Sequence, residues 1–329
     1  MKKNLLLPAF ALALGILAGC DQKTQETPPE PTPAPIPTPT TPSQETQPPA
    51  QSGKVITHEQ GSVRVAKAPS RIAVFDFGAL DTMNALKVEG IAALPKKNLP
   101  GYLVEYAKTD IVNAGGMKQP DLQALGTLKP DLIIISGRQS KSFEALNGIA
   151  PTVNLSLDAK HYLGSIKKNV MTIGQIFNKE AEAENGLAVL DKKIADVRIK
   201  AESAHLKAMV LVHYNGKLSA SNSNAYAAVV YQIVGLQHAD EGLTEGRQAA
   251  TPDYIAEKNP DVIFVVDRNE AIGEGKMDRA LLEENEQIRQ TGAFRKGKIV
   301  YLRPDLWYLS GGGLESLSLQ LDEVSRAIQ

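Results

Sequence analysis

Short apolar runs rich in β-branched residues alternate with amphipathic segments from Lys54 to the end of the chain. Apart from a charged first residue in some of them, the runs are continuously apolar, which is typical of strands buried on both faces of a mainly parallel sheet. The predicted strands are 71–75, 131–135, 208–212, 261–266 and 299–302. Helical patterns lie between them, for example at 79–86, 120–128 and 252–258. The alternation predicts an α/β fold with mainly parallel sheets.

One part of this pattern occurs twice. Residues 121–134 and 251–264 each read as a short helix, a Pro-Asp turn that ends it, and a buried strand. An arginine follows each strand, Arg138 in the first copy and Arg268 in the second. Ligands of open α/β sheets bind beyond the carboxyl ends of the strands. We therefore expect two Rossmann-like lobes, each presenting an arginine to a cleft between them.

A long helical stretch separates the two copies. Leu163, Ile166, Val170, Ile173 and Ile176 follow the 3/4 spacing of one apolar helix face. We expect residues 161–180 to form a stiff helix between an N-terminal lobe (54–160) and a C-terminal lobe (181–329). Residues 181–204 are rich in Glu, Lys and Ala and predict a solvated amphipathic helix.

The start of the chain has the pattern of an export signal. Lys2 and Lys3 precede an apolar stretch over 5–17, which is too short to span a bilayer. Leu17-Ala18-Gly19-Cys20 resembles the lipobox of bacterial lipoproteins. This resemblance implies that 1–19 is a signal peptide and that Cys20 is lipidated; the alternative is an ordinary secretory signal with an incidental cysteine.

The residue after the cysteine bears on the location. Asp21 resembles the signal that retains lipoproteins in the inner membrane of Gram-negative bacteria, which implies an anchor on the periplasmic side. In a Gram-positive organism the same protein would be a cell-surface lipoprotein. Residues 20–53 are dominated by Pro, Thr, Gln, Glu and Ser and cannot bury a core. They predict an extended, disordered tether with a reach on the order of 90 Å.

Composition and motifs narrow the class of function. The net charge of −1 lacks the basic excess of a nucleic-acid-binding protein. A single cysteine excludes an intramolecular disulfide. No Gly-x-Ser-x-Gly, phosphate loop or His-Glu-x-x-His is present, and the five histidines are not at metal-ligand spacing. Binding without a cofactor is therefore favoured over catalysis; among the histidines, His213 ends a predicted strand, where a cleft residue could lie.

Three separated segments, in order, carry a resemblance to a known family. Residues 136–140, 264–269 and 306–316, together with 96–100, resemble the CeuE/FatB group. These are catecholate-siderophore-binding lipoproteins of ABC iron importers, within the class III binding proteins built on a helical backbone. The likeness runs from about Val74 to the C-terminus. It implies a monomer that captures a ferric siderophore and delivers it to an inner-membrane permease with its ATPase.

The resemblance also assigns roles to individual residues. Arg138 and Arg268 match two arginines of the family's cleft, one from each lobe. A guanidinium suits this ligand because its fork of donors can contact catecholate oxygens while it carries a permanent charge. Tyr308 matches a tyrosine that ligates iron directly when the siderophore supplies only four donors. A phenolate is a hard oxygen ligand, as Fe(III) prefers.

The chain departs from the family at two places. The loop 240–249 lacks the histidine that serves as the second direct ligand, and His238 could replace it only if the loop were rearranged. A third arginine of the family falls near Ala225 and Tyr226 and is missing here. Tyr226 is then a candidate ligand contact, and Arg247 is the candidate replacement for the missing charge. These departures favour a six-donor tris-catecholate over a four-donor complex.

Two further residues concern the transporter. Gln123 and Asp253 lie where related proteins usually have a carboxylate that docks on the importer, and only Asp253 keeps the charge. Two alternative functions stay open at this point. One is binding of another iron complex, a hydroxamate siderophore or haem. The other is a surface lipoprotein without transport function, such as an adhesin, which would leave the paired arginines unexplained.

Overall fold

The computed structural model describes residues 53–329, and they form the expected α/β fold. The N-terminal lobe contains a parallel sheet of five strands in the order β5-β4-β3-β6-β7. Its strands are β3 (Ile72–Val74), β4 (Ile91–Leu94), β5 (Val112–Asn113), β6 (Leu132–Ile135) and β7 (Thr152–Asn154). Every residue of β3 and β6 is buried, which agrees with their uninterrupted apolar sequence.

The C-terminal lobe contains a mixed sheet in the order β11-β9-β8-β12-β13, and β10 pairs with β8 off this path. Its strands are β8 (Lys207–Tyr214), β9 (Lys217–Ala220), β10 (Gln237–His238), β11 (Gln248–Ala249), β12 (Val262–Asp267) and β13 (Ile299–Tyr301). β8, β10, β12 and β13 are parallel, whereas β9 and β11 pair antiparallel at one edge. The mainly parallel sheets and the two-lobed fold class are therefore confirmed.

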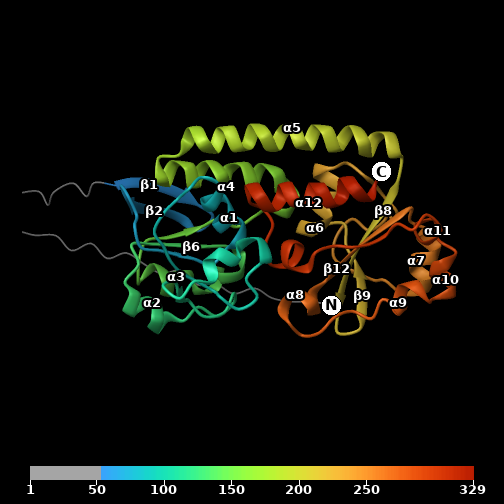
Figure 1. The fold of residues 1–329 in the computed structure, drawn as a ribbon, viewed down its shortest axis with the longest axis horizontal. Helices are drawn as coiled ribbons and strands as arrows, with labels where there is room; N and C mark the ends of the chain where they lie inside the picture. The colour runs from blue at the N-terminus through green and yellow to red at the C-terminus, as the bar shows by residue number, and fades with distance from the viewer. Residues whose placement is uncertain (1–52) are drawn as a thin grey trace, which may run out of the picture. The chain divides into compact units, whose positions relative to one another are not determined.

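Short helices connect the strands in both lobes (Figure 1). Those of the N-terminal lobe are α1 (Phe77–Ala85), η1 (Gly101–Ala107), α2 (Leu122–Leu128), η2 (Gly137–Ser142), α3 (Phe143–Asn147) and η3 (Ala159–His161). Those that follow β9 are α6 (Ala225–Ala227), η4 (Ala228–Ile233), α7 (Pro252–Lys258), α8 (Arg268–Ile272), α9 (Ala280–Glu283), α10 (Glu286–Arg289), α11 (Gly292–Arg295), η5 (Asp305–Leu309) and α12 (Leu314–Ala327). η4 and η5 are π-helical, and the other η segments are 3₁₀ helices.

The repeat in the sequence is also a repeat in the structure. α2 and α7 both end at a left-handed residue, Lys129 (φ 51°) and Asn259 (φ 41°), and a Pro-Asp pair leads into β6 and β12. The two aspartates accept equivalent hydrogen bonds. Asp131 accepts hydrogen bonds from the backbone N–H of Arg71 (2.9 Å) at the start of β3, and Asp261 accepts from Lys207 (3.0 Å) at the start of β8. Each copy thereby aligns its strand with the neighbouring strand of the sheet.

Two consecutive helices lie between the strands of the two lobes. α4 (Tyr162–Phe177) ends on the N-terminal lobe, where the Nζ of Lys54 contacts Asn178 at 2.8 Å. α5 (Glu180–Ala204) then runs back over both lobes to the start of β8 (Figure 1). Its 25 residues span about 37 Å. The apolar stripe of α4 is buried, and α4 packs on α1 of the N-terminal lobe and on η4, which follows β9. The expected bounds of the interlobe helix, 161–180, stay a prediction.

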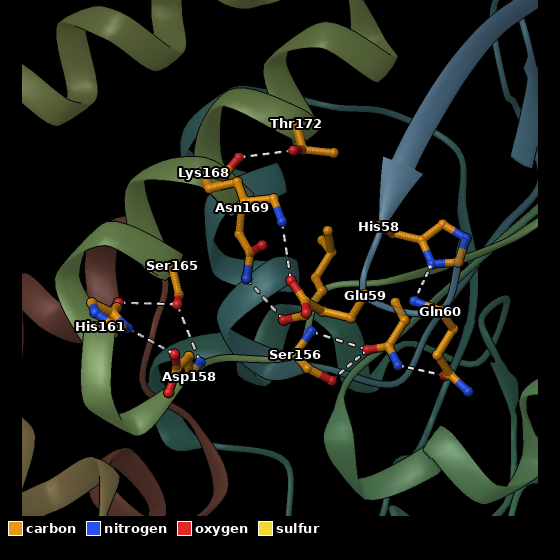
Figure 2. A network of polar contacts seen from close by, with 12 residues as sticks. His58, Glu59, Gln60, Ser156, Asp158, His161, Ser165, Lys168, Asn169 and Thr172 are labelled. Atoms are coloured by element: carbon orange, nitrogen blue, oxygen red, sulfur yellow. Dashed lines mark hydrogen bonds and ion pairs between the residues drawn. The ribbon is translucent and has the colours of Figure 1, made fainter. Parts of the chain in front are cut away.

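A hairpin that the sequence did not reveal precedes the first lobe. β1 (Gly53–His58) and β2 (Gly61–Ala66) pair antiparallel. Polar contacts tie its turn to the lobe: the amide of Gln60 donates to the carbonyl of Ser140 (3.2 Å), and the amide of Asn154 donates to Gln60 Oε1 (2.5 Å). Figure 2 shows Gln60 and His58 beside this network, which continues through Ser156 toward α4. The hairpin thereby braces η2.

The C-terminal helix starts against the N-terminal lobe. The fully buried carboxylate of Asp81 in α1 accepts hydrogen bonds from the backbone N–H groups of Glu315 (3.2 Å) and Ser316 (3.1 Å) at the start of α12. A Cβ on Gly78 would lie 2.3 Å from the carbonyl oxygen of Gly311, so glycine is needed for this close approach. Burial raises the pKa of Asp81 to about 7, although these hydrogen bonds lower it.

The predicted signal peptide, Cys20, Asp21 and the tether lie outside the described residues, so they stay predictions. Between residues 53 and 329, no helix is both long and apolar enough to cross a membrane.

Candidate ligand-binding site

Side chains from both lobes meet beyond the carboxyl ends of β6, β8 and β12. Arg138 of the N-terminal lobe donates to the backbone carbonyls of Tyr308 (Nη2, 2.6 Å) and Leu309 (Nη1, 3.4 Å). The guanidinium of Arg268 lies 5.7 Å from the ring centroid of Tyr308, and the Tyr226 and Tyr308 rings are 6.2 Å apart. We name Arg138, Tyr214, Tyr226, Arg247, Arg268 and Tyr308 the arginine–tyrosine cluster.

Arg138 is presented by a braced turn. η2 begins directly after β6, and its N-cap Ser136 forms a capping box with Gln139. The buried Gln139 side chain accepts a hydrogen bond from the N–H of Ser136 (3.0 Å) and donates to the carbonyls of Phe75 (3.4 Å) and Met117. Because the side chain of Gln139 ties the turn to backbone groups of Phe75 and Met117, the turn holds Arg138 at the edge of the sheet.

Arg268 is presented by the equivalent strand of the other lobe. It follows Asp267, whose buried carboxylate accepts from the N–H of Asn269 (3.1 Å) and of Met277 (2.6 Å). The ring of His213 adds a contact from Nδ1 to Asp267 Oδ1 at 2.8 Å. His213 is thus a buried partner of Asp267 and lies next to the cluster without facing it. Because His213, Asn269 and Met277 already bind the carboxylate of Asp267, this carboxylate does not compete with a ligand for the neighbouring Arg268.

Tyr226 lies among the cationic groups of the cluster. It belongs to α6, whose N-cap Asn224 accepts a hydrogen bond from the N–H of Ala227 (2.8 Å). Burial raises the pKa of Tyr226 to about 12, while the guanidinium groups of Arg138, Arg247 and Arg268 lower it. All three arginines are therefore near one phenol, although Arg247 itself is exposed in the loop before α7.

The charge of the cluster is not balanced by acids. Within residues 53–329, Arg138, Arg247 and Arg268 have no carboxylate oxygen within 4.0 Å. The guanidinium of Arg138 lowers the pKa of Asp76, the N-cap of α1. Burial raises the pKa of Asp76, which weakens its ability to offset the arginines. The cluster thus offers three cations to an anionic ligand.

Not every predicted site residue joins this cluster. His238 pairs with Ala208 at the start of β8, whereas Asp267 pairs with His213 near its end, about 17 Å away along the strand. Its ring stacks on Tyr231 with centroids 3.7 Å apart, and burial lowers its pKa. His238 is therefore not placed to ligate iron beside Tyr308. In the described part of the chain, no group of three or more His, Cys, Asp or Glu side chains could hold a metal ion.

The two docking candidates occupy equivalent places in the repeat. Gln123 is exposed on α2 and Asp253 is exposed in the first turn of α7. Asp253 also accepts a hydrogen bond from the side chain of Gln287. The structure thus leaves both side chains accessible on corresponding helices.

Tyr214 is a member of the cluster that the sequence did not single out. It is the last residue of β8, and the guanidinium of Arg268 lies over its ring, 3.6 Å from the ring centroid. The signal that could have found it is the strand pairing, because the residue opposite a post-strand arginine lies on the neighbouring parallel strand. That pairing is not readable from one sequence.

Known proteins share this fold and much of this sequence. The family model described as periplasmic binding protein matches residues 72–306. The petrobactin-binding protein YclQ of Bacillus subtilis is 38% identical over 82% of this chain and 86% of its own, and its crystal structure superposes with a TM-score of 0.81. The ferric-anguibactin-binding protein FatB of Vibrio anguillarum is 29% identical over 99% of this chain and 98% of its own. The structure of the periplasmic catecholate-siderophore-binding protein VctP of Vibrio cholerae has a TM-score of 0.77 at 26% identity, covering 84% of this chain and 100% of that one.

Proposed function

Because this chain belongs to the periplasmic binding protein family, we propose that it is the substrate-binding lipoprotein of an ABC iron importer. Its ligand is a ferric catecholate siderophore, held at the arginine–tyrosine cluster. The observation that carries this proposal is that Arg138 and Arg268, one from each lobe, meet at Tyr308 without an ion-pair partner in the described residues. The binding functions named for YclQ, FatB and VctP support the same ligand class.

Charge and geometry favour this ligand on physical grounds. An iron(III) ion bound by three catecholates carries a net charge of about −3, which three guanidinium groups match. Each guanidinium presents a planar fork of N–H donors, so Arg138 and Arg268 can each contact a pair of catecholate oxygens. Partial burial of both side chains strengthens these contacts relative to contacts in water.

The placement of His238 bears on the number of donors that the siderophore supplies. A four-donor complex leaves two iron positions for the protein, and Tyr308 is the single ligand that the resemblance supplies to the cluster. A six-donor complex needs no protein ligand and relies on the arginines alone. We therefore propose a six-donor tris-catecholate as the preferred ligand, with Tyr308 and Tyr226 as contacts to its rings and oxygens.

Delivery of the ligand needs an anchor and a partner. We propose that Cys20 carries the lipid, that Asp21 retains the protein at the periplasmic face of the inner membrane, and that the protein acts as a monomer. In a Gram-positive organism the same anchor would place it at the cell surface. Asp253 and Gln123 are the proposed contacts to the permease, which an ATPase drives, and Asp253 supplies the charge. This role predicts that Asp253→Asn lowers siderophore uptake by cells while the affinity for the ligand is unchanged.

A fluorescence titration tests the ligand. Trp307 is buried and directly precedes Tyr308 in the sequence, so a ferric complex at the cluster should quench the fluorescence of Trp307. We expect saturable quenching by six-donor ferric catecholates, weaker binding of four-donor complexes, and no tight binding of ferric hydroxamates. Tyr308→Phe should weaken the four-donor complex more than the six-donor complex. Tight binding of hydroxamates without a response to catecholates would contradict the proposal.

A further inference from the structure

Three consecutive residues of β8 and its turn face three consecutive residues that start at the end of β12. In the parallel register, His213 lies opposite Asp267. The next residues along, Tyr214 and Arg268, are in contact through the face of the tyrosine ring at 3.6 Å. The third residues, Asn215 and Asn269, exchange two hydrogen bonds.

The outer two pairs are locked by directional contacts. His213 Nδ1 lies 2.8 Å from Asp267 Oδ1, and its Nε2 accepts from the N–H of Gly216 at 3.1 Å. The N–H of Asn215 donates to Asn269 Oδ1 at 3.1 Å, and Asn269 Nδ2 donates back to Asn215 Oδ1 at 3.2 Å. Asn215 (φ 50°) and Gly216 (φ 72°) form the two-residue turn between β8 and β9, with both residues in the left-handed region that type I′ turns require.

The middle pair has a different character. Tyr214 stays 38% exposed, and the Nε of Arg268 is buried without a hydrogen-bond partner among residues 53–329. Arg268 is therefore held by the face of a ring and not by an acid. A ring under the guanidinium fixes its plane while its N–H edge stays free for a ligand.

We propose that Tyr214 is a positioning residue of the ligand site, which sets the plane of the Arg268 guanidinium for a ligand that presents two oxygens in one plane, as an iron-bound catecholate does. This inference rests on the proposed function and adds to it the residue that selects the orientation of the bound ring. The pairs His213–Asp267 and Asn215–Asn269 hold Tyr214 in place. Tyr214 acts through Arg268 and needs its ring, not its hydroxyl, to do so.

The test compares two substitutions that separate ring from hydroxyl. Tyr214→Phe keeps the ring and should bind a six-donor ferric catecholate within about twofold of wild type. Tyr214→Leu removes it and should weaken binding about two- to thirtyfold, the range that a cation–π contact supplies. In an Arg268→Ala background, Tyr214→Leu should have no further effect. The control is Phe294→Leu, which removes the Arg289–Phe294 contact (5.5 Å) at the amino end of β12 and should leave affinity unchanged.

A second measurement needs no ligand. The Nε–H resonance of Arg268 in the free protein should be shifted by the ring current of Tyr214, should keep that shift in Tyr214→Phe and should lose it in Tyr214→Leu. The inference is overturned if Tyr214→Leu binds like wild type, if Tyr214→Phe loses as much as Tyr214→Leu, or if the loss persists without Arg268. If wild type binds no ferric catecholate, the proposed function fails, and the resonance alone decides whether Tyr214 positions Arg268.

Discussion

Arg138 and Arg268 occupy equivalent places in the two lobes but are held in different ways. Arg268 is oriented within its own lobe, by the ring of Tyr214. Arg138 reaches to the segment after β13 and donates to the carbonyls of Tyr308 and Leu309. The orientation of Arg138 thus depends on how the lobes meet, whereas Arg268 is pre-oriented. A ligand gains the full contact from Arg268, but at Arg138 it competes with two backbone acceptors.

The largest expected effect is the loss of either arginine. Arg268→Ala should weaken the binding of a six-donor ferric catecholate by about 10- to 150-fold, because hydrogen bonds to charged groups contribute about 1.5–3 kcal/mol. Arg138→Ala should cost less, since part of that contact replaces the bonds to the Tyr308 and Leu309 carbonyls. Isothermal titration calorimetry measures both. A larger loss for Arg138→Ala would reverse the comparison.

The supports of the two arginines can be broken separately. Gln139→Leu leaves the carbonyls of Phe75 and Met117 and the N–H of Ser136 without their partner. His213→Leu takes one partner from the buried Asp267. Each should lower the free energy of unfolding by about 1–3 kcal/mol, measured by urea denaturation. Ser318→Ala serves as the control, because it removes only the hydroxyl that accepts a hydrogen bond from Lys193 Nζ. It should change the free energy of unfolding far less.

The contact of Asp81 with the start of α12 lies close in sequence to the carbonyls that accept from Arg138. Its contribution to stability should depend on pH. The folded pKa of Asp81 is raised to about 7, so the folded state keeps a proton that the unfolded chain loses near pH 4. The contribution of Asp81 to stability is therefore fully present below about pH 4 and declines as the pH rises to 7, by at most about 1.4 kcal/mol per pH unit. Denaturation at several pH values should show a flatter profile for Asp81→Asn. An unchanged profile would contradict this assignment.

The smallest effect is expected at Arg247. Its side chain is exposed, so Arg247→Ala should weaken ligand binding by less than about fivefold, as for charge contacts in water. The difference from wild type should shrink as salt rises from low to physiological ionic strength, because exposed charges are screened. Titrations at two salt concentrations check this. A loss as large as that of Arg268→Ala would make Arg247 a direct contact.

The sequence predicted the elements whose signal is local. The apolar runs became β3, β6, β8, β12 and β13, and the repeated helix, Pro-Asp and strand pattern placed Arg138 and Arg268 at the carboxyl ends of equivalent strands. The resemblance supplied Tyr308, which the structure brings next to both arginines. These features depend on residues close together in the chain or on matching motifs.

The features that the sequence missed depend on distant partners. The hairpin β1–β2 has alternating, partly exposed residues that no apolar run marks, and it is stabilised by contacts of Gln60 with Ser140 and Asn154. α5 reads as a solvated helix, although its narrow buried face packs across both lobes. Tyr214 and the displacement of His238 follow from the pairing of β8 with β12 and β10, which sets positions by register.

The most direct measurement is the affinity of the wild-type protein and of the double variant Arg138→Ala, Arg268→Ala for one six-donor ferric catecholate, by titration calorimetry at physiological ionic strength. We expect one ligand bound per wild-type protein. We expect the double variant to lose at least about 100-fold in affinity while its thermal unfolding is unchanged, since each lost charged contact contributes roughly 1.5–3 kcal/mol. Equal affinity of the two proteins, or no binding to the wild type, would contradict it.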